Sequence, residues 1–268
     1  MGLIPTMGFL HEGHLSLIHV ARQHGADFIV VSIFVNPLQF GPNEDFQRYP
    51  RDEGHDRRLL EEQGVDLLFL PSVETMYPPG AATKVILADV ADPLEGDRRP
   101  GHFTGVATVV LKLFNIVQPD VAVFGRKDAQ QCAVIERIVA DLDVPVRLVF
   151  GETIREHDGV AMSSRNSYLS PEQRALAPAL HRALRAGEEA LKHGIHQAEA
   201  VEKLMHKMAA ESPAVEVDYL VVVDPITFRA PVDFHRDVLL AGAVRIGKTR
   251  LIDNICVPKN AMPHAHLK

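Results

Sequence analysis

The chain has 268 residues, of which 46% are hydrophobic and 24% charged, and its formal net charge is −7. These proportions are ordinary for a soluble globular protein, and they exclude disorder, collagen and coiled coil as the main architecture. No apolar run approaches the ~20 residues of a membrane-spanning helix, and scattered Lys and Arg form no basic face, so we expect neither a membrane nor a nucleic-acid partner. The two cysteines, Cys132 and Cys256, predict neither a disulfide framework nor a zinc cluster, and are typical of a reducing compartment.

In the first part of the chain, short apolar runs alternate with amphipathic stretches of helical length. The strand-like runs are residues 2–5, 28–35, 67–70, 85–88, 121–124 and 146–150. The helix-like stretches are residues 15–24, 52–63, 106–117 and 129–142. This alternation predicts an α/β fold, a Rossmann-like parallel sheet with helices on both faces. In such sheets, ligands bind beyond the carboxyl ends of the strands.

The polar segment 151–170 breaks the alternation and predicts a hinge. Ser170 and Pro171 then favour a helix start, with Ser as N-cap and Pro in the first turn. Two helical stretches follow to about residue 211, and the runs 215–223, 238–246 and 250–256 are strand-like. We therefore expect a Rossmann-like domain over residues 1–153 and a smaller α+β C-terminal domain over residues 154–268, with residues 259–268 frayed.

The stretch PTMGFLHEGH, residues 5–14, follows the first strand and opens the first helix. A helix N-terminus offers unpaired N–H groups and a partial positive charge, which suit a phosphate. His11 and His14 share a face if the turn is helical, and two imidazoles there can donate to phosphate oxygens as charge builds. Gly13 allows a close backbone approach. The alternatives are a plain surface turn and a zinc site, although the stretch is not H-E-x-x-H and no third ligand is placed.

This stretch resembles the HxGH signature of the nucleotidyltransferases related to class I aminoacyl-tRNA synthetases. More narrowly, the chain resembles the pantothenate synthetase family. The resemblance rests on the blocks IPTMGFLHEGHLSLI, VSIFVNPLQFGPNEDFQRYPR, RPGHFTGVATVVLKLFNIVQPD, FGRKDAQQ and DGVAMSSRNSYLS. They run in the family's order from residue 4 to about residue 170, and VDYL and TRLIDNI extend them into the C-terminal part.

The resemblance implies a two-step ligase on the route to coenzyme A. The carboxylate of pantoate attacks the α-phosphate of ATP, giving pantoyl-adenylate and pyrophosphate. The amine of β-alanine then attacks the acyl carbon, giving pantothenate and AMP. The resemblance also implies Mg²⁺ with the ATP, a homodimer and a cytoplasmic location. The first domain would bind ATP and pantoate, and the smaller domain would be a lid that closes to keep water from the acyl-adenylate.

Three segments and one hinge residue are implied to bind ATP, with His14, His11 and Lys127 as catalytic residues. The loop MSSR resembles the counterpart of the synthetases' KMSKS loop, and its hydroxyls and forked cation can wrap a polyphosphate. The ATP-binding set is Met7, Gly8, Phe9, Leu10, His11, Glu12, Gly13, His14, Gly125, Arg126, Lys127, Asp128, Ile154, Met162, Ser163, Ser164 and Arg165. No metal ligand is assigned.

Gln39 and Gln131 are implied to bind the substrate acid. A neutral amide can hydrogen-bond a carboxylate without neutralising it, which suits a carboxylate that must stay a nucleophile. Phe34 and Phe40 can supply apolar surface for a branched acid. The alternative for both glutamines is an ordinary polar contact of a loop or helix.

Residues 125–128 form a second strand-to-helix turn, where Lys127 can meet phosphate and Asp128 can accept from ribose hydroxyls or fix Lys127. Family members usually carry an acidic residue where this chain has Arg126, which leaves Lys127 and the backbone donors in place. Another basic cluster, Arg98, Arg99 and His102 in GDRRPGHF, gives second-tier site candidates, with a solvated loop as the alternative.

Residues 242–249, GAVRIGKT, satisfy the P-loop pattern G-x-x-x-x-G-K-[ST]. Their context instead favours a hairpin, because apolar residues alternate before Gly247 and a second strand-like run follows Thr249. Two functions compete with the pantothenate-forming ligase. One is an HxGH nucleotidyltransferase with a different acceptor, and the other is a non-catalytic nucleotide-binding module.

Overall fold

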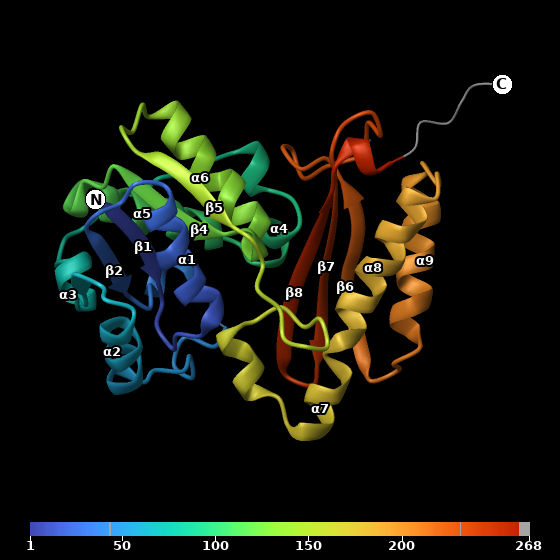
Figure 1. The fold of residues 1–268 in the computed structure, drawn as a ribbon, viewed down its shortest axis with the longest axis horizontal. Coiled ribbons are helices and arrows are strands. Elements are labelled where there is room, and N and C mark those ends of the chain that lie inside the picture. The colour runs from blue at the N-terminus through green and yellow to red at the C-terminus, as the bar shows by residue number, and fades with distance from the viewer. Residues whose placement is uncertain (43, 231, 263–268) are drawn as a thin grey trace. The chain divides into compact units, whose positions relative to one another are not determined.

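The computed structural model of the chain describes residues 1–42, 44–230 and 232–262. Contacts within the chain divide it into two compact units, Met1–Ile154 and Arg155–Lys268 (Figure 1). Each unit has its own sheet. Among the described residues no helix is both long and apolar enough to cross a membrane.

The first unit contains a five-stranded parallel sheet in the order β3-β2-β1-β4-β5. The predicted Rossmann-like architecture is therefore confirmed. The strands are β1 (Gly2–Thr6), β2 (Ile29–Ile33), β3 (Leu67–Phe69), β4 (Val121–Gly125) and β5 (Arg147–Gly151). The helices are α1 (Glu12–Gln23), α2 (Glu53–Glu62), α3 (Val73–Met76), α4 (Glu95–Arg98), α5 (His102–Val117) and α6 (Ala129–Asp141), and the 3-10 turns are η1 (Pro37–Gln39), η2 (Asp89–Ala91) and η3 (Arg126–Asp128).

Both faces of this sheet are buried, which explains why its strands are apolar almost throughout. One cluster joins alternate strand residues such as Ile4 and Val123 to Ile18 of α1 and Leu60 of α2. On the opposite face, the ring of Phe124 packs edge-on against Phe114 of α5, with centroids 6.4 Å apart. Helices α1 and α2 thus cover one face of the sheet, and α5 covers the other.

The strand predicted at residues 85–88 is wrong. These residues have no regular structure, and Ile86 is 78% exposed. A strand needs a neighbouring backbone for its ladder, whereas here the Val85 N–H donates to the hydroxyl Oγ1 of Thr108 on α5 at 3.0 Å. This short apolar run thus lies against α5 instead of joining the sheet.

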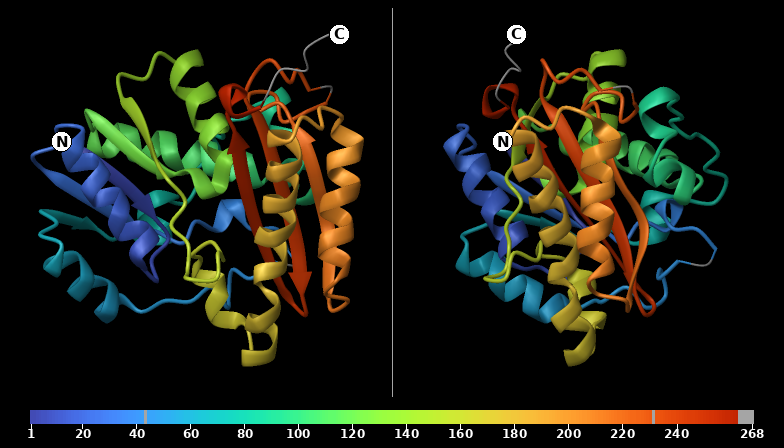
Figure 2. Two further views of the ribbon diagram at one scale, coloured as in Figure 1. Left: turned by 45° about the vertical axis from the view of Figure 1, so that its right-hand side comes forward. Right: turned by 90° about the vertical axis from the view of Figure 1, so that its right-hand side faces the viewer.

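The second unit combines three antiparallel strands with helices (Figure 2). The strands are β6 (Val215–Val223), β7 (Val238–Ile246) and β8 (Thr249–Val257), and the helices are α7 (Pro171–Leu176), α8 (Pro178–Lys192) and α9 (Ala198–Ala210), with 3-10 turns η4 (Ser164–Tyr168) and η5 (Lys259–Ala261). The helices α8 and α9 lie side by side along the sheet and bury Leu184 and Met205 against Leu240 of β7. The predicted smaller α+β unit is confirmed.

Two of this unit's helices begin at local sequence signals. Ser170 caps α7 in a capping box with Gln173, as the predicted helix start requires. The helical region has three helices instead of the two predicted, because Pro178 begins a new one. The fraying predicted from residue 259 is wrong for Lys259–Ala261, which form η5, and residues 263–268 lie outside the described residues.

The P-loop alternative is excluded by the geometry of residues 242–249. β7 and β8 pair antiparallel with Ile246 opposite Thr249, so Gly247 and Lys248 form a two-residue turn. Gly247 has a φ of +59°, the conformation that a glycine supplies at the first central position of a type II′ turn. A phosphate-cradling loop between a strand and a helix is therefore absent here.

Candidate active site

The strand order places the two predicted phosphate-binding turns at the same edge of the sheet. β1 and β4 are parallel neighbours, with Gly2 opposite Val121. From β1 the chain crosses to β2 on one side, and from β4 it crosses to β5 on the other. The carboxyl ends of β1 and β4 therefore form a topological switch point, where ligands of open α/β sheets bind.

The HxGH segment forms the N-terminus of α1. His11 is the N-cap, and its Nδ1 accepts the N–H of Gly13 at 3.2 Å. The Nδ1 of His14 accepts the N–H of His11 at 3.3 Å. The two rings lie together, with centroids 4.1 Å apart and planes inclined by 38°. The structure thus brings the two predicted histidines into one capping arrangement.

These hydrogen bonds fix the state of both imidazoles. Because each Nδ1 accepts a backbone N–H, each neutral ring carries its proton on Nε2 and can donate from there. Burial, with the neighbouring His11 and Lys127, lowers the pKa of His14 from 6.5 to about 3. His14 is therefore a neutral donor at any physiological pH.

The loop before α1 is held by a residue that the sequence did not single out. The buried carboxylate of Asp56, on α2, accepts the N–H of Phe9 at 2.8 Å and the N–H of Leu10 at 2.7 Å. Both Gly8 (φ +81°) and Phe9 (φ +52°) have left-handed backbone, which bends the chain sharply between β1 and α1. Asp56 satisfies two amide groups in this bend, forty-six and forty-seven residues away along the chain.

The turn after β4 separates its two cations. The ammonium of Lys127 lies 3.6 Å from Oδ1 of Asp128, and its side chain is 20% exposed. Arg126 is instead 53% exposed, pairs with Glu152 at 3.3 Å, and places its guanidinium 5.6 Å from the ring centre of Phe150. Lys127 is thus the more enclosed cation at the switch point.

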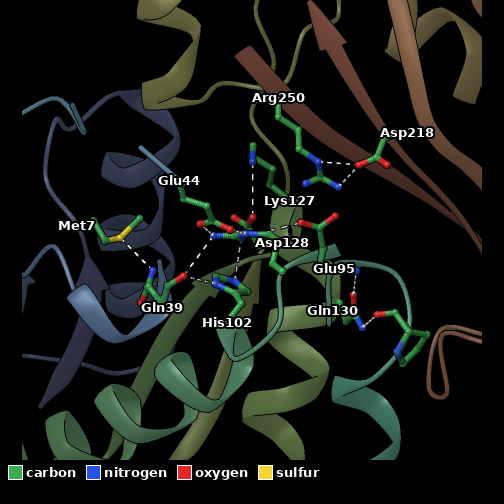
Figure 3. A network of polar contacts seen from close by, with 12 residues as sticks. Met7, Gln39, Glu44, Glu95, His102, Lys127, Asp128, Gln130, Asp218 and Arg250 are labelled. Carbon is green, nitrogen blue, oxygen red and sulfur yellow. Dashed lines mark hydrogen bonds and ion pairs between the residues drawn. The ribbon is translucent and has the colours of Figure 1, made fainter. Parts of the chain in front are cut away.

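Gln39 is buried and lies in a network of side chains beyond β2 (Figure 3). Its Nε2 donates to Sδ of Met7 at 3.0 Å, and its Oε1 accepts Nδ2 of Asn36 at 3.0 Å. Asn36 also accepts the hydroxyl of Tyr77 at 2.9 Å and donates to the carbonyl of Gly105 at 3.0 Å. Met7 and Gln39, predicted for different ligands, therefore touch each other.

The two neighbouring glutamines of α6 have different environments. Gln130 is buried, accepts the N–H of Glu95 and donates to the carbonyls of Val90 and Pro93, so it fixes the segment before α4. Gln131 is half-buried, and its side chain makes no hydrogen bond within the described part of the chain. The assignment of Gln131 to the substrate acid stays a prediction.

The two aromatic residues proposed to line the acid site have separate environments. Phe34 is buried with its ring centre 6.1 Å from Tyr77, which joins it to the Asn36 network. The ring of Phe40 lies 5.4 Å from Phe46 and 5.9 Å from Tyr49. Phe40 therefore anchors the loop that follows η1.

The predicted loop Met162–Arg165 belongs to the second unit, and Ile154 is the last residue of the first. Ser163 caps η4 by accepting the N–H of Arg165 at 3.3 Å. The strand-like entry to the loop is held by Arg155, whose guanidinium makes two hydrogen bonds, of 2.6 and 3.0 Å, to the buried carboxylate of Asp253. The loop is thus a built structure within its own unit.

Arg174 also fixes this loop. It reaches back from α7 to the carboxylates of Asp158 and Glu156, each at 2.7 Å. The hydrogen bond from Arg174 lowers the pKa of Asp158. These contacts hold the backbone of residues 156–158 just before the predicted polyphosphate loop.

The chain is similar to known proteins over nearly its whole length. A sequence profile of the family described as Pantoate-beta-alanine ligase matches residues 1–256. The pantothenate synthetase of Herpetosiphon aurantiacus is 55% identical over 256 residues, covering 95% of this chain and 92% of the relative, and that of Moorella thermoacetica is 53% identical over 260 residues, covering 97% and 92%. The chain belongs to the pantoate–β-alanine ligase family.

Solved structures of this family agree with the fold. The pantothenate synthetase of Thermus thermophilus superposes with a TM-score of 0.92 at 48% identity, covering 98% of this chain and 93% of that one. The ligase of Francisella tularensis, solved with beta-gamma ATP and beta-alanine, superposes with a TM-score of 0.78 at 34% identity over 97% of this chain and 89% of that one. The protein is therefore an enzyme, a ligase of pantothenate biosynthesis.

Proposed function

We propose that this ligase forms pantothenate through a pantoyl-adenylate, and that the switch-point edge of the first unit carries the chemistry. In the first step a carboxylate oxygen of pantoate attacks the α-phosphorus of ATP, and the bond to the bridging oxygen of pyrophosphate breaks. In the second step the amine of β-alanine attacks the acyl carbon, loses a proton, and AMP leaves with the ester oxygen. The observation that carries the proposal is the pair of Nε2–H donors at α1 beside Lys127.

The HxGH histidines and the backbone of residues 7–13 bind the nucleotide in this proposal. His14 and His11 direct neutral N–H donors at the transferred phosphoryl, where charge develops during the first step. Their neutral state matters, because a charged imidazolium would repel the ammonium of Lys127, whereas a neutral N–H donor does not. Removing such a donor lowers the rate without changing the charge balance of the site.

Lys127 meets the polyphosphate as a point charge, and Gly125 and Arg126 contribute backbone to the same turn. Mg²⁺ usually keeps several waters and binds through one or two carboxylates together with substrate phosphates. Among the described residues no three metal-ligating side chains lie together, and the half-exposed Asp128 offers one carboxylate at the turn. This donor set fits a Mg²⁺ that arrives with ATP and offsets phosphate charge, with Asp128 as its protein partner.

Gln39 and Gln131 bind pantoate through neutral amides, which leave the carboxylate nucleophilic. Gln39 keeps one N–H and one lone pair beyond its contacts to Met7 and Asn36. Gln131 contributes its whole amide group. The β-alanine seen in the Francisella tularensis ligase supports the same acceptor for this chain.

In this proposal a further set of ATP ligands comes from the hinge residue Ile154 and from Met162, Ser163, Ser164 and Arg165 of the smaller C-terminal domain. Arg165 and the two serine hydroxyls suit a polyphosphate because they combine a forked cation with two donors. The family resemblance further supports a lid role for this domain, a cytoplasmic location and a homodimer. Light scattering in solution tests the homodimer directly.

The decisive experiment is ATP–pyrophosphate exchange with and without pantoate. We expect exchange only when pantoate is present, since the adenylate must form before pyrophosphate can be reincorporated. Exchange without pantoate would support a nucleotidyltransferase with another acceptor. No exchange under either condition would support a non-catalytic binding module. As a second test, Gln131→Ala should raise the KM for pantoate much more than the KM for ATP. Gln130→Ala is the comparison, because it removes buried contacts that hold the segment before α4 and should lower the stability of the fold.

A further inference from the structure

The basic cluster in GDRRPGHF divides into an outer and an inner arginine. Arg98 is 45% exposed and pairs with the adjacent Asp97. Arg99 is 17% exposed, and its guanidinium makes two hydrogen bonds, of 2.8 and 2.7 Å, to the carboxylate of Glu44. A two-point pair of this kind fixes direction as well as distance. Arg99 is therefore tied to a residue fifty-five positions away along the chain, whereas Arg98 pairs with its sequence neighbour.

Next to Arg99, the buried ring of His102 connects this pair to the main chain of Gln39 (Figure 3). The Nδ1 of His102 lies 2.8 Å from the carbonyl oxygen of Gln39, and its Nε2 lies 3.0 Å from Nη1 of Arg99. A carbonyl only accepts and a guanidinium only donates, so His102 carries its proton on Nδ1 and presents a lone pair at Nε2. Burial, followed by the charge of Arg99, lowers the pKa of His102 to about 4, which agrees with this neutral tautomer.

The main chain around Gln39 also packs against the backbone of α5, the helix that begins at His102. A Cβ on Gly105 would lie 2.3 Å from the carbonyl oxygen of Leu38 and 2.6 Å from the nitrogen of Gln39, so only glycine permits this approach. The carbonyl of Gly105 also accepts from Asn36. The turn η1 is thus packed against the start of α5, through the backbone at Gly105 and the side chain of His102.

Arg99 connects Gln39 to Glu44 in the loop that follows η1. Its Nη2 lies 3.4 Å from the Gln39 carbonyl oxygen, and the same guanidinium binds Glu44. Glu95, one turn before Arg99, adds a carboxylate 3.9 Å from Nη1. The start of the loop after η1 is therefore tied to the segment 95–102 through a single guanidinium.

We propose that Glu44, Arg99 and His102 form a positioning cluster that fixes the main chain of Gln39 and thereby sets the affinity for pantoate. None of the three contacts the substrate in this proposal. They act through Gln39, whose amide must face the acid while its backbone is held from behind. The inference rests on the proposed role of Gln39, and it assigns a function to the GDRRPGHF motif.

The test compares His102→Asn with His102→Gln. The amide nitrogen of asparagine lies close to the position of Nδ1 and can donate to the Gln39 carbonyl, whereas that of glutamine lies close to Nε2 and cannot. We expect His102→Gln to raise the KM for pantoate about tenfold or more, the effect of a lost buried hydrogen bond, and His102→Asn to restore most of the affinity. Calorimetric affinity for a non-hydrolysable ATP analogue should stay within about twofold in both.

Arg99→Ala and Arg98→Ala form the matched control pair. Arg99→Ala should raise the KM for pantoate, while Arg98→Ala should leave it at the wild-type value. Equal effects of the two arginines, or a wild-type pantoate KM in a folded His102→Gln protein, would overturn the inference. A failure of the proposed function can be told apart from a failure of this inference, because in that case the wild-type protein itself would show no pantoate-dependent pyrophosphate exchange.

Discussion

Arg126 forms an ion pair with Glu152, 3.3 Å away at the end of β5, while the ammonium of its neighbour Lys127 lies 3.6 Å from Asp128. The two adjacent cations of this turn therefore serve different partners. Arg126 also lies over the ring of Phe150, so its side chain is directed along the sheet edge. The guanidinium of Arg126 is thus turned to Glu152 and Phe150, and Lys127 keeps its place beside Asp128.

The first prediction follows from this separation. Arg126→Glu should keep kcat/KM for ATP within about tenfold, or about 1.4 kcal/mol in the barrier, because it changes an exposed pair. Lys127→Ala should reduce the same constant by far more, since it removes the enclosed cation at the switch point. Both constants must be measured at one salt concentration. Equal losses would make Arg126 a phosphate ligand.

His14→Ala should slow pantoyl-adenylate formation by ~10²–10³, the usual effect of removing one preorganised donor from a developing charge. His19→Ala, on the exposed side of the same helix, is the matched control and should behave as wild type. Single-turnover formation of the adenylate is the measurement. A His14 variant within tenfold of wild type would remove His14 from the catalytic assignment.

Asp56→Asn should impair nucleotide binding although Asp56 is not assigned to touch the nucleotide. The amide keeps one acceptor but turns an NH₂ group toward a backbone N–H of the bend, which leaves a buried donor unpaired at about 1–3 kcal/mol of stability. Displacement of the HxGH backbone should lower the adenylation rate by roughly tenfold to a hundredfold. Urea unfolding and single-turnover kinetics measure the two effects.

Asp52→Asn provides the comparison on the same helix. Asp52 caps α2 by accepting the N–H of His55 at 2.9 Å, and asparagine is an equally good N-cap. That variant should be nearly neutral in both measurements. If it is as damaging as Asp56→Asn, the defect lies in α2 as a whole and not in the bend.

Lys248→Ala should leave the affinity for an ATP analogue unchanged within about twofold, because Lys248 lies in the hairpin turn between β7 and β8. Gly247→Ala should instead destabilise the protein by about 1 kcal/mol or more. Its φ is +59°, and a Cβ there would lie 2.4 Å from Nε2 of Gln173. Calorimetric titration and thermal unfolding distinguish the two effects. A collapse of nucleotide affinity in Lys248→Ala would contradict the hairpin interpretation.

Acidification should reduce stability before most carboxylates titrate. The pKa values of His14 and His102 are lowered to about 3 and about 4, respectively, whereas unfolded histidines titrate near 6.5. Between these values the unfolded state binds more protons than the folded state, so the free energy of unfolding falls as the pH falls. Urea unfolding at pH 7 and pH 5 should show this loss, and it should be smaller in His102→Asn. An identical loss in both proteins would exclude His102 as a contributor.

The periodicity of the sequence predicted most of the fold because the central strands of the first sheet, β1, β2 and β4, are buried on both faces. The long helices were placed to within a few residues, since their apolar stripes face a sheet. The error at residues 85–88 arose because a short apolar run does not reveal whether a neighbouring strand exists to pair with it. In this chain the hydroxyl of Thr108 takes the place of that neighbour for Val85.

The candidate site could be predicted where its residues lie close together in the sequence. His11 and His14 could be paired from their spacing, and Lys127 from its place after a strand. Asp56 and Asn36 were missed because their roles depend on contacts with residues distant in sequence, such as Leu10 and Gly105. An acidic residue on the buried side of an otherwise polar helix was the available signal for Asp56, since such a group must find donors.

The central place of β1 and β4 has a consequence for how the site loosens. Each strand has a neighbour on both sides, and Gly2–Val121 and Leu3–Ala122 pair the two strands directly. The amide protons at this paired centre exchange with solvent only when the sheet itself opens, whereas η1 can be released by local breaking of side-chain contacts. The turns carrying His14 and Lys127 continue directly from these protected strands. Gln39 depends instead on η1 and the cluster behind it. In mild denaturant we therefore expect Gln39 to lose its fixed position first, while the turns carrying His14 and Lys127 keep their shape.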